Sequence, residues 1–209
     1  QFKMLYNEQR MNQGGDPYDY TVWNADTDWQ DEMFQTGFLT NNTVSITASG
    51  DRSKFYLGLG YVMEEGSIKS EKLNKFTVNL HSEHKVTDFL RFGFQVNGVR
   101  ALYPDAKGVG SALKAAPIAP VYDAESGLLH TLPDFQRAQV WNPMIEPVLR
   151  GAHNKSANYR MAGNIYGELD LMKNLTFKAT FSLDYASSQS RSYSPLIYVY
   201  NPDVEGGKD

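Results

Sequence analysis

The stretch that most constrains the fold is residues 175–185, in which apolar and polar side chains alternate without exception. The odd positions carry the apolar set: Leu175, Phe177, Ala179, Phe181, Leu183 and Tyr185. The even positions carry the polar set: Thr176, Lys178, Thr180, Ser182 and Asp184. Because successive side chains of a strand point to opposite faces, this pattern predicts a strand with one apolar and one polar face. Its length suits the roughly 9–11 residues with which a tilted strand crosses a bilayer, but a half-buried strand of a soluble sandwich alternates in the same way.

The same alternation recurs along the chain, which predicts an all-β fold. The further segments are residues 43–49, 54–62, 74–84, 90–98 and 159–169. The connections between successive strands run short, longer, short, very long and short. In an up-and-down sheet every second connection lies at the same end, so the short turns gather at one end and the long loops at the other. Bacterial outer-membrane barrels have this asymmetry, whereas a Greek-key sandwich need not.

The N-terminal segment, residues 1–41, is predicted to hold loops and two short helices. Phe2, Leu5 and Tyr6 have helical spacing, and Asp28 is suited to cap a second helix that starts at Trp29. The first residues lack the charged region and apolar core of a signal peptide. The chain also starts without Met, as a fragment or a processed product would.

Composition narrows the classes of function. The 209 residues carry a formal net charge of −4, so no basic surface points to nucleic acid. No apolar run approaches the ~20 residues of a membrane-spanning helix, which excludes a helical membrane protein but not a barrel. The chain has no Cys, and therefore neither a disulfide framework nor a thiolate nucleophile.

The sequence predicts neither a metal site nor a catalytic centre. His81 and Glu83 share a strand face without a third ligand nearby, so we interpret them as residues of a polar surface. The acidic residues between Asp26 and Glu32 lack the spacing of a calcium-binding loop, and helix capping is the preferred interpretation. No nucleophile stands beside a base, and we expect no cofactor and no enzymatic activity.

Residues 101–157 interrupt the strand pattern with several prolines, and long irregular connections of this kind are usually functional or disordered. Four aromatic residues in it are candidates for stacking on the sugar rings of a substrate: Tyr103, Tyr122, Phe135 and Trp141. The alternative is that these rings pack the loop onto itself or onto a partner. The loop is not composed like a flexible linker, because several of its side chains can pack: Leu113, Ile118, Val121, Trp141 and Ile145.

Several short motifs resemble those of one family. Residues 27–34 read Thr-Asp-Trp-Gln-Asp-Glu-Met-Phe, and Asn-Thr-Val-Ser-Ile-Thr-Ala-Ser-Gly follows at 42–50. A hairpin then carries Tyr-Leu-Gly-Leu-Gly-Tyr at 56–61 and Glu-Gly-Ser-Ile-Lys at 65–69. With Ala-Pro-Val-Tyr-Asp at 119–123 and Asn-Pro at 142–143, these motifs resemble TonB-dependent transporters of the SusC/RagA type over most of residues 27–186.

The resemblance implies a 22-stranded, antiparallel, up-and-down outer-membrane barrel around an N-terminal plug, of which this chain holds about six strands and no plug. It implies an importer in the outer membrane of a Gram-negative bacterium, driven by TonB, ExbB and ExbD through the plug. It also implies a SusD-like surface lipoprotein as lid. Substrates in this family are glycans more often than peptides.

On this interpretation residues 42–100 form four barrel strands and residues 158–187 form two. The segments 1–41, 101–157 and 188–209 are then expected to be extracellular.

The alternation also predicts which way each strand residue points in a barrel. The apolar side chains should face lipid: Phe55, Leu57, Phe76, Val78, Phe92, Phe94, Phe177 and Phe181. The polar side chains expected to point into the lumen are Arg91, Gln95, Lys178 and Asp184. Two alternatives stay open: a soluble β-sandwich that binds carbohydrate, and a passive porin. A sandwich would bury the apolar faces between two sheets, and a porin would lack a plug.

Overall fold

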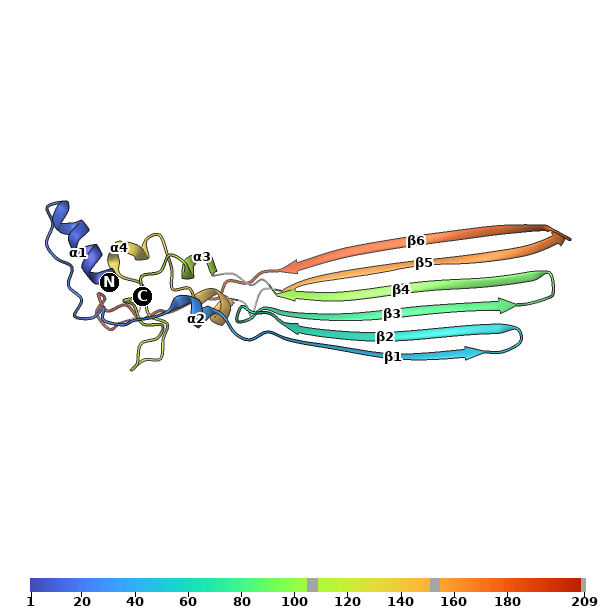
Figure 1. The fold of residues 1–209 in the computed structure, drawn as a ribbon, viewed down its shortest axis with the longest axis horizontal. Helices are drawn as coiled ribbons and strands as arrows, with labels where there is room; N and C mark the ends of the chain where they lie inside the picture. Colours follow the sequence, from blue (N-terminus) through green and yellow to red (C-terminus); the bar gives the residue numbers. More distant parts are fainter. Residues whose placement is uncertain (105–108, 151–154, 208–209) are drawn as a thin grey trace.

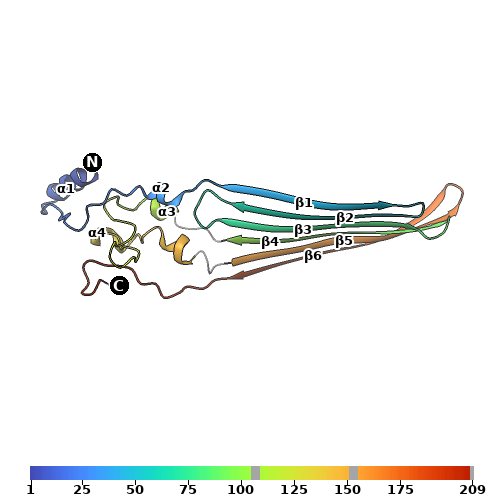
Figure 2. The same ribbon diagram turned by 90° about the horizontal axis from the view of Figure 1, so that it is seen from below.

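A computed structural model describes residues 1–104, 109–150 and 155–207 of the chain. It consists of two regions, a six-stranded sheet of long strands and a cluster of short helices and loops at one end of that sheet (Figure 1). A view turned by 90° again shows the strands as one sheet with the helices beyond its end (Figure 2). We call the second region the loop cap and define it as residues 1–37, 66–71, 109–150 and 192–207.

The sheet is antiparallel, and its spatial order follows the chain order from β1 to β6. Its strands are β1 (Phe38–Ser49), β2 (Ser53–Glu65), β3 (Lys72–Lys85), β4 (Leu90–Pro104), β5 (Lys155–Met172) and β6 (Leu175–Arg191). The six predicted strands and the up-and-down topology are therefore confirmed. Each strand is longer than its alternating segment, because backbone pairing continues into polar residues such as Asn158 and Ser188, where side-chain periodicity gives no signal.

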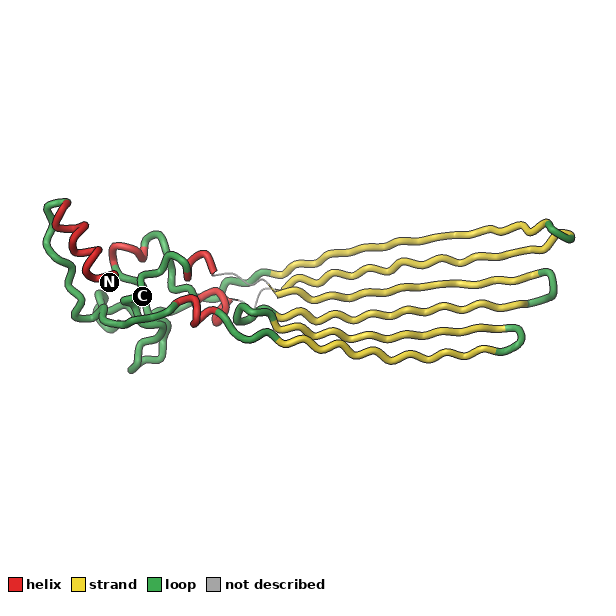
Figure 3. The backbone as a smooth tube through the Cα atoms, in the orientation of Figure 1, coloured by secondary structure: helices red, strands yellow, loops and turns green. Residues whose placement is uncertain are grey.

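All short turns lie at the end of the sheet away from the loop cap (Figure 3). They join β1 to β2, β3 to β4 and β5 to β6. The last turn places Asn174 at φ 70°, in the left-handed region that Asn tolerates better than most residues. The predicted separation of short turns from long connections is thus confirmed.

The loop cap contains helices α1 (Phe2–Asn12), α2 (Trp29–Met33), α3 (Val109–Ala112) and α4 (Asp134–Arg137), and a π-helical turn η1 (Ile145–Arg150). The predicted cap of α2 is confirmed, because Asp28 Oδ1 accepts hydrogen bonds from the amides of Gln30 at 3.0 Å and Asp31 at 3.1 Å. Among the described residues, no helix has the length and apolar character to cross a membrane.

The hydrophobic core of the described chain sits in the loop cap. Its buried members are Trp23, Trp29, Met33, Ala112, Ala116, Ile118, Ala119, Leu129, Leu132, Val140, Met144, Ile145 and Val199. The indole of Trp29 also donates a hydrogen bond to the carbonyl of Ala116 at 2.9 Å, which joins α2 to the long loop. In the described part of the chain, Ala101 is the one buried hydrophobic residue that belongs to a strand.

The prediction that the long loop packs is correct for some residues and wrong for others. Ile118 and Ile145 are buried, and Val121 packs against the core. Leu113 and Trp141 are instead 65% and 66% exposed. Sequence alone could not separate these two groups, because their burial is decided by contacts with residues far away in the chain.

Candidate functional site

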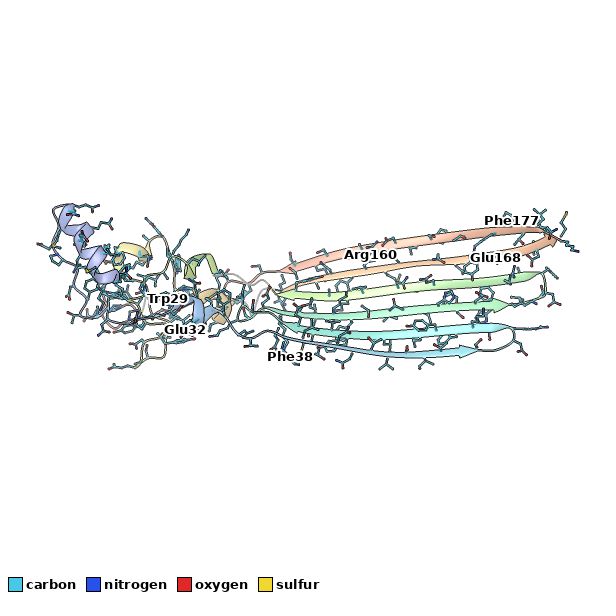
Figure 4. The ribbon with its side chains drawn as sticks, in the orientation of Figure 1. Trp29, Glu32, Phe38, Arg160, Glu168 and Phe177 are labelled. Carbon is cyan, nitrogen blue, oxygen red and sulfur yellow. The ribbon has the colours of Figure 1, made fainter. Side chains whose placement is uncertain are left out.

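The register of the sheet sorts its side chains onto two faces. Across the sheet, Ala48 pairs with Phe55, then Ser82, Phe94, Ile165 and Phe181 in successive strands. Residues two positions away along each strand share that face. All the strand residues that the alternation predicts to face lipid therefore lie on one face, which we call the apolar face. Side chains stand out from the strands along the length of the sheet (Figure 4).

The apolar face has no cover within the described chain. Among the elements that the structure describes, each strand contacts only its neighbours in the sheet, and no helix packs against a strand. Val44 and Phe181, at opposite edges, are 66% and 68% exposed. A sandwich would bury this face against a second sheet, so the arrangement contradicts the sandwich alternative for the described residues and defines one layer of a membrane-barrel wall.

The opposite, polar face carries the four residues predicted to point into a lumen: Arg91, Gln95, Lys178 and Asp184. Arg91 pairs across the strands with Glu168, which pairs in turn with Lys178. Gln95 pairs with Asn164, and Asp184 pairs with Ala162. The described structure thus gathers these four residues on one face. That this face lines a lumen remains a proposal.

Near the short turns, charges on the polar face form a connected network. The Nζ atom of Lys178 lies 2.7 Å from Glu168 Oε1, and Arg91 reaches both Glu168 at 3.4 Å and Asp170 at 3.3 Å. Glu168 is labelled in Figure 4. The ring of Tyr166 lies under Lys178 at 4.4 Å and covers Gly93, where a Cβ atom would come within 2.6 Å of the ring. This end of the polar face is therefore tightly organised by paired charges.

Near the loop cap, the polar face carries a further ion pair. Arg160, labelled in Figure 4, donates to both carboxylate oxygens of Asp184, at 3.2 and 2.6 Å. Ser188 donates to Asn158 Oδ1 at 2.6 Å. Tyr103, one of the predicted substrate-binding residues, lies on this face at the end of β4 and is 43% exposed.

The other three aromatic candidates lie apart in the loop cap. Tyr122 is exposed on a short hairpin that pairs it with Leu129. Phe135 on α4 belongs to a ring cluster and lies 4.4 Å from the ring of Tyr6. Trp141 borders a cavity of about 520 Å³. The structure does not bring the four aromatic residues together, and their contact with a substrate remains a proposal.

Several residues around that cavity were not predicted from the sequence. Asn142 is buried, and its amide donates to the carbonyls of Val121 at 3.0 Å and His130 at 2.8 Å, while its oxygen accepts from the amide of Met144. This side chain ties three loop segments together. In the sequence, only the Asn-Pro motif at 142–143 drew attention to Asn142. Its structural role could not be inferred, because its hydrogen-bond partners lie far away in the chain. Thr131, which also borders the cavity, belongs to no motif or periodic pattern that could have indicated it.

Hydrogen bonds and burial also shift the pKa values of several groups of the loop cap, among them Tyr18 and Asp123. Burial raises the pKa of Tyr18 well above its usual value, and its hydrogen bond to Asp134 Oδ1 at 2.8 Å acts in the same direction. In the exposed hairpin, the hydroxyl and amide of Ser126 donate to Asp123 and hold the pKa of this carboxyl below its usual range. Both interactions fix loop geometry.

The fold and the two faces define the class of the protein as a β-barrel wall segment with a packed loop cap. No protein-family profile matches the chain. TonB-dependent receptor P3 of Formosa agariphila is 26% identical over 200 residues, which cover 90% of this chain and 19% of that receptor. TonB-dependent receptor SusC of Bacteroides thetaiotaomicron is 30% identical over 115 residues, which cover 53% of this chain and 12% of SusC. The chain thus spans about a fifth, or less, of the length of these relatives.

Among solved structures, the RagAB peptide importer in its closed-closed state aligns with a TM-score of 0.65 at 18% identity, over 80% of this chain and 20% of that chain. At this identity the likeness shows the fold alone, and the fold agrees with the barrel prediction. Together with the sequence matches, it confirms the resemblance to TonB-dependent receptors of the SusC/RagA type.

Proposed function

We propose that the chain is part of a TonB-dependent importer in the outer membrane of a Gram-negative bacterium. The observation that carries this proposal is the single-layered sheet, whose apolar face is uncovered while its polar face holds paired charges. Lipid would cover the first face and the water-filled or plugged lumen would meet the second. The similarity to TonB-dependent receptors supports active uptake rather than passive diffusion.

The strand edges support membership of a larger barrel. β1 and β6 each have one strand neighbour in the described chain. An unpaired edge is not viable in lipid, because each unsatisfied backbone group there costs several kcal/mol. Six strands also fall short of the eight or more that bacterial barrels use. Further strands of the same transporter are therefore expected to pair with both edges.

The loop cap is proposed to lie outside the cell, because barrels of this kind place their short turns on the periplasmic side. A SusD-like lipoprotein is the proposed lid over it, and a plug elsewhere in the transporter is the proposed contact for TonB. The resemblance favours glycans over peptides as cargo. The barrel wall does not distinguish between these two classes of cargo.

Uptake measurements on cells that carry the full-length transporter test this proposal. Uptake of the cognate oligomer should saturate, and it should stop when the proton gradient is collapsed or when TonB is deleted. A passive porin would instead continue to pass the oligomer under both conditions. That result would replace the importer with the porin alternative.

A further inference from the structure

Basic side chains gather on the apolar face of the sheet, at the end that joins the loop cap. The register places Arg100 of β4, Lys155 of β5 and Arg191 of β6 on the same face as Phe181. All three basic residues are exposed. No Asp or Glu shares this face in the parts of β4, β5 and β6 that lie between the height of Phe181 and the loop cap. We call these three residues the basic rim.

The basic rim differs from the bases of the polar face because it has no ionic partner. On the polar face, Arg91, Arg160 and Lys178 each lie within 3.4 Å of a carboxylate oxygen. The described residues offer no carboxylate within ion-pair distance of the basic rim. Its three positive charges are therefore available to an anion from outside the described chain.

Two members of the basic rim stand directly opposite each other. Lys155 pairs with Arg191 in the antiparallel register of β5 and β6. Residues in such positions have Cβ atoms about 4.5–5.5 Å apart, and like charges placed there destabilise a sheet. An anion between the two side chains would replace their mutual repulsion with attraction to a shared partner. The pair therefore has the geometry of an anion-binding position.

Arg100 supplies a second contact point at some distance from this pair. Its guanidinium carbon lies 5.8 Å from the ring centroid of Tyr159, which stands opposite Arg100 on the apolar face. Tyr159 is four residues from Lys155 along β5, which corresponds to about 13 Å. Tyrosine rings are also typical of the boundary between lipid and water in barrels. Two separated positive positions at this boundary suit a head group that carries more than one negative charge.

An apolar groove lies on the same face, next to the basic rim. Its volume is about 270 Å³, and its apolar lining consists of Phe94, Val96, Met161, Ile165, Phe181 and Leu183. Gly163 lies among these residues and adds no side chain that would fill the groove. Met161, two residues from Tyr159, lies at the end nearest to the basic rim. A hydrocarbon chain is favourably buried in such a groove, so one face offers contacts for a charged head group and for its acyl chain.

We propose that the basic rim and the groove together bind a phosphorylated lipid of the outer leaflet. Its phosphate groups contact Lys155, Arg191 and Arg100, and one acyl chain lies in the groove. Phosphate is the matching anion, because Lys and Arg are its usual ligands in proteins. The strands carry no Lys or Arg on the apolar face near the short turns, so the site is confined to one leaflet. The inference rests on the proposed barrel, and it assigns the wall a ligand that is not transported.

Native mass spectrometry of the purified full-length transporter tests the inference. The probes are diphosphoryl lipid A and the same lipid without its phosphate groups, each titrated into the protein in detergent. The diphosphoryl form should bind at least about tenfold more tightly, because each Lys or Arg near an anionic lipid surface contributes about fivefold in affinity. Glucosamine 1-phosphate, which carries a phosphate but no acyl chain, should not displace the lipid.

Matched charge variants locate the site. Lys155→Gln and Arg191→Gln together should weaken the binding of diphosphoryl lipid A by about twenty-fivefold. Lys75→Gln removes a charge at the height of Arg100 but on the polar face, and should leave binding unchanged. Arg191→Glu places opposite charges across from each other at Lys155. It should weaken lipid binding while the lipid-free transporter stays at least as stable as the wild type, which a damaged fold could not do.

Equal affinity for the two lipids, or a double variant that binds as tightly as the wild type, would overturn the inference. So would an equal loss of binding in Lys75→Gln. Displacement of the lipid by glucosamine 1-phosphate would also overturn it, because the basic rim would then bind phosphate without the acyl chain. None of these results would affect the proposed function, which fails only if uptake does not need the proton gradient and TonB.

Discussion

Met33 in the loop cap and Phe181 on the sheet are both large apolar residues, but Met33 is fully buried and Phe181 is 68% exposed. Met33 is covered by side chains from several loop segments, whereas nothing in the described chain covers Phe181. Soluble monomers rarely expose a continuous apolar surface of this extent. The comparison indicates that the loop cap carries its own core, while the apolar face of the sheet has no cover in the described chain. The proposed function assigns that cover to lipid.

The largest effect is expected from removing much of the core of the loop cap while leaving the sheet intact. Deletion of residues 108–143 from the full-length transporter removes α3, α4 and most of the long loop. Because no helix packs on a strand among the described residues, the barrel should still insert and keep its heat-modifiable mobility on gels. Uptake or lid capture should be lost. Unchanged growth on the cognate substrate would show that the loop cap is dispensable.

Shortening one buried side chain of the loop cap should destabilise that region and leave the sheet unchanged. Met33→Ala removes a fully buried side chain and should cost about 2–5 kcal/mol of loop-cap stability. Hydrogen exchange should become faster throughout the loop cap and stay unchanged in the strands. The matched variant Met4→Ala, at a residue that is 67% exposed, should change stability by less than about 0.5 kcal/mol. Faster exchange in the strands of Met33→Ala would mean that the two regions are not independent.

An added charge should destabilise folding of the sheet into lipid only when it lies on the apolar face. Phe181→Arg places a cation on the apolar face and should cost about 2–4 kcal/mol of folding into lipid vesicles if it lies near the bilayer midplane. Thr180→Arg, one residue away on the polar face, should cost much less. Equal losses for the two variants would argue against a membrane wall.

The smallest effect concerns alkaline pH and the loop cap. Because the folded pKa of Tyr18 is raised above its usual value of about 10, the folded loop cap favours the protonated phenol. This contribution to stability is present below pH 10 and is lost as the pH rises through the folded pKa. Tyr18→Phe should therefore make loop-cap stability, followed by tryptophan fluorescence, less sensitive to pH above 10. The same pH dependence in both proteins would rule out this role.

The sheet was largely predictable because its information is local. In residues 175–185 the apolar or polar character of each side chain indicates the face of the strand to which it belongs. The lengths of the connections then indicate at which end of the sheet the turns and the loops lie. The helix cap at Asp28 was predictable for the same reason, since its hydrogen bonds reach only two and three residues along the chain. The strand ends were not, because backbone pairing needs no side-chain pattern.

The loop cap was not predictable in the same way, because its contacts are long-range. Trp29 bonds to Ala116, and Thr131 pairs its backbone with Tyr200. No periodicity links such residues. Phe135 and Trp141 are both aromatic and lie six positions apart, yet the first packs in a ring cluster and the second remains exposed beside the cavity. Composition identified both as candidates but could not distinguish their environments.

The central claim, that lipid covers one face of the sheet, is tested most directly by spin labels along β6. Nitroxides would be placed singly at positions 177–185 of the full-length transporter in lipid bilayers, with any cysteines outside this cysteine-free chain replaced. Collision with molecular oxygen, which concentrates in lipid, should be high at the odd positions, low at the even positions and repeat every two residues. Equal accessibility at odd and even positions, or odd positions shielded from oxygen, would contradict the account.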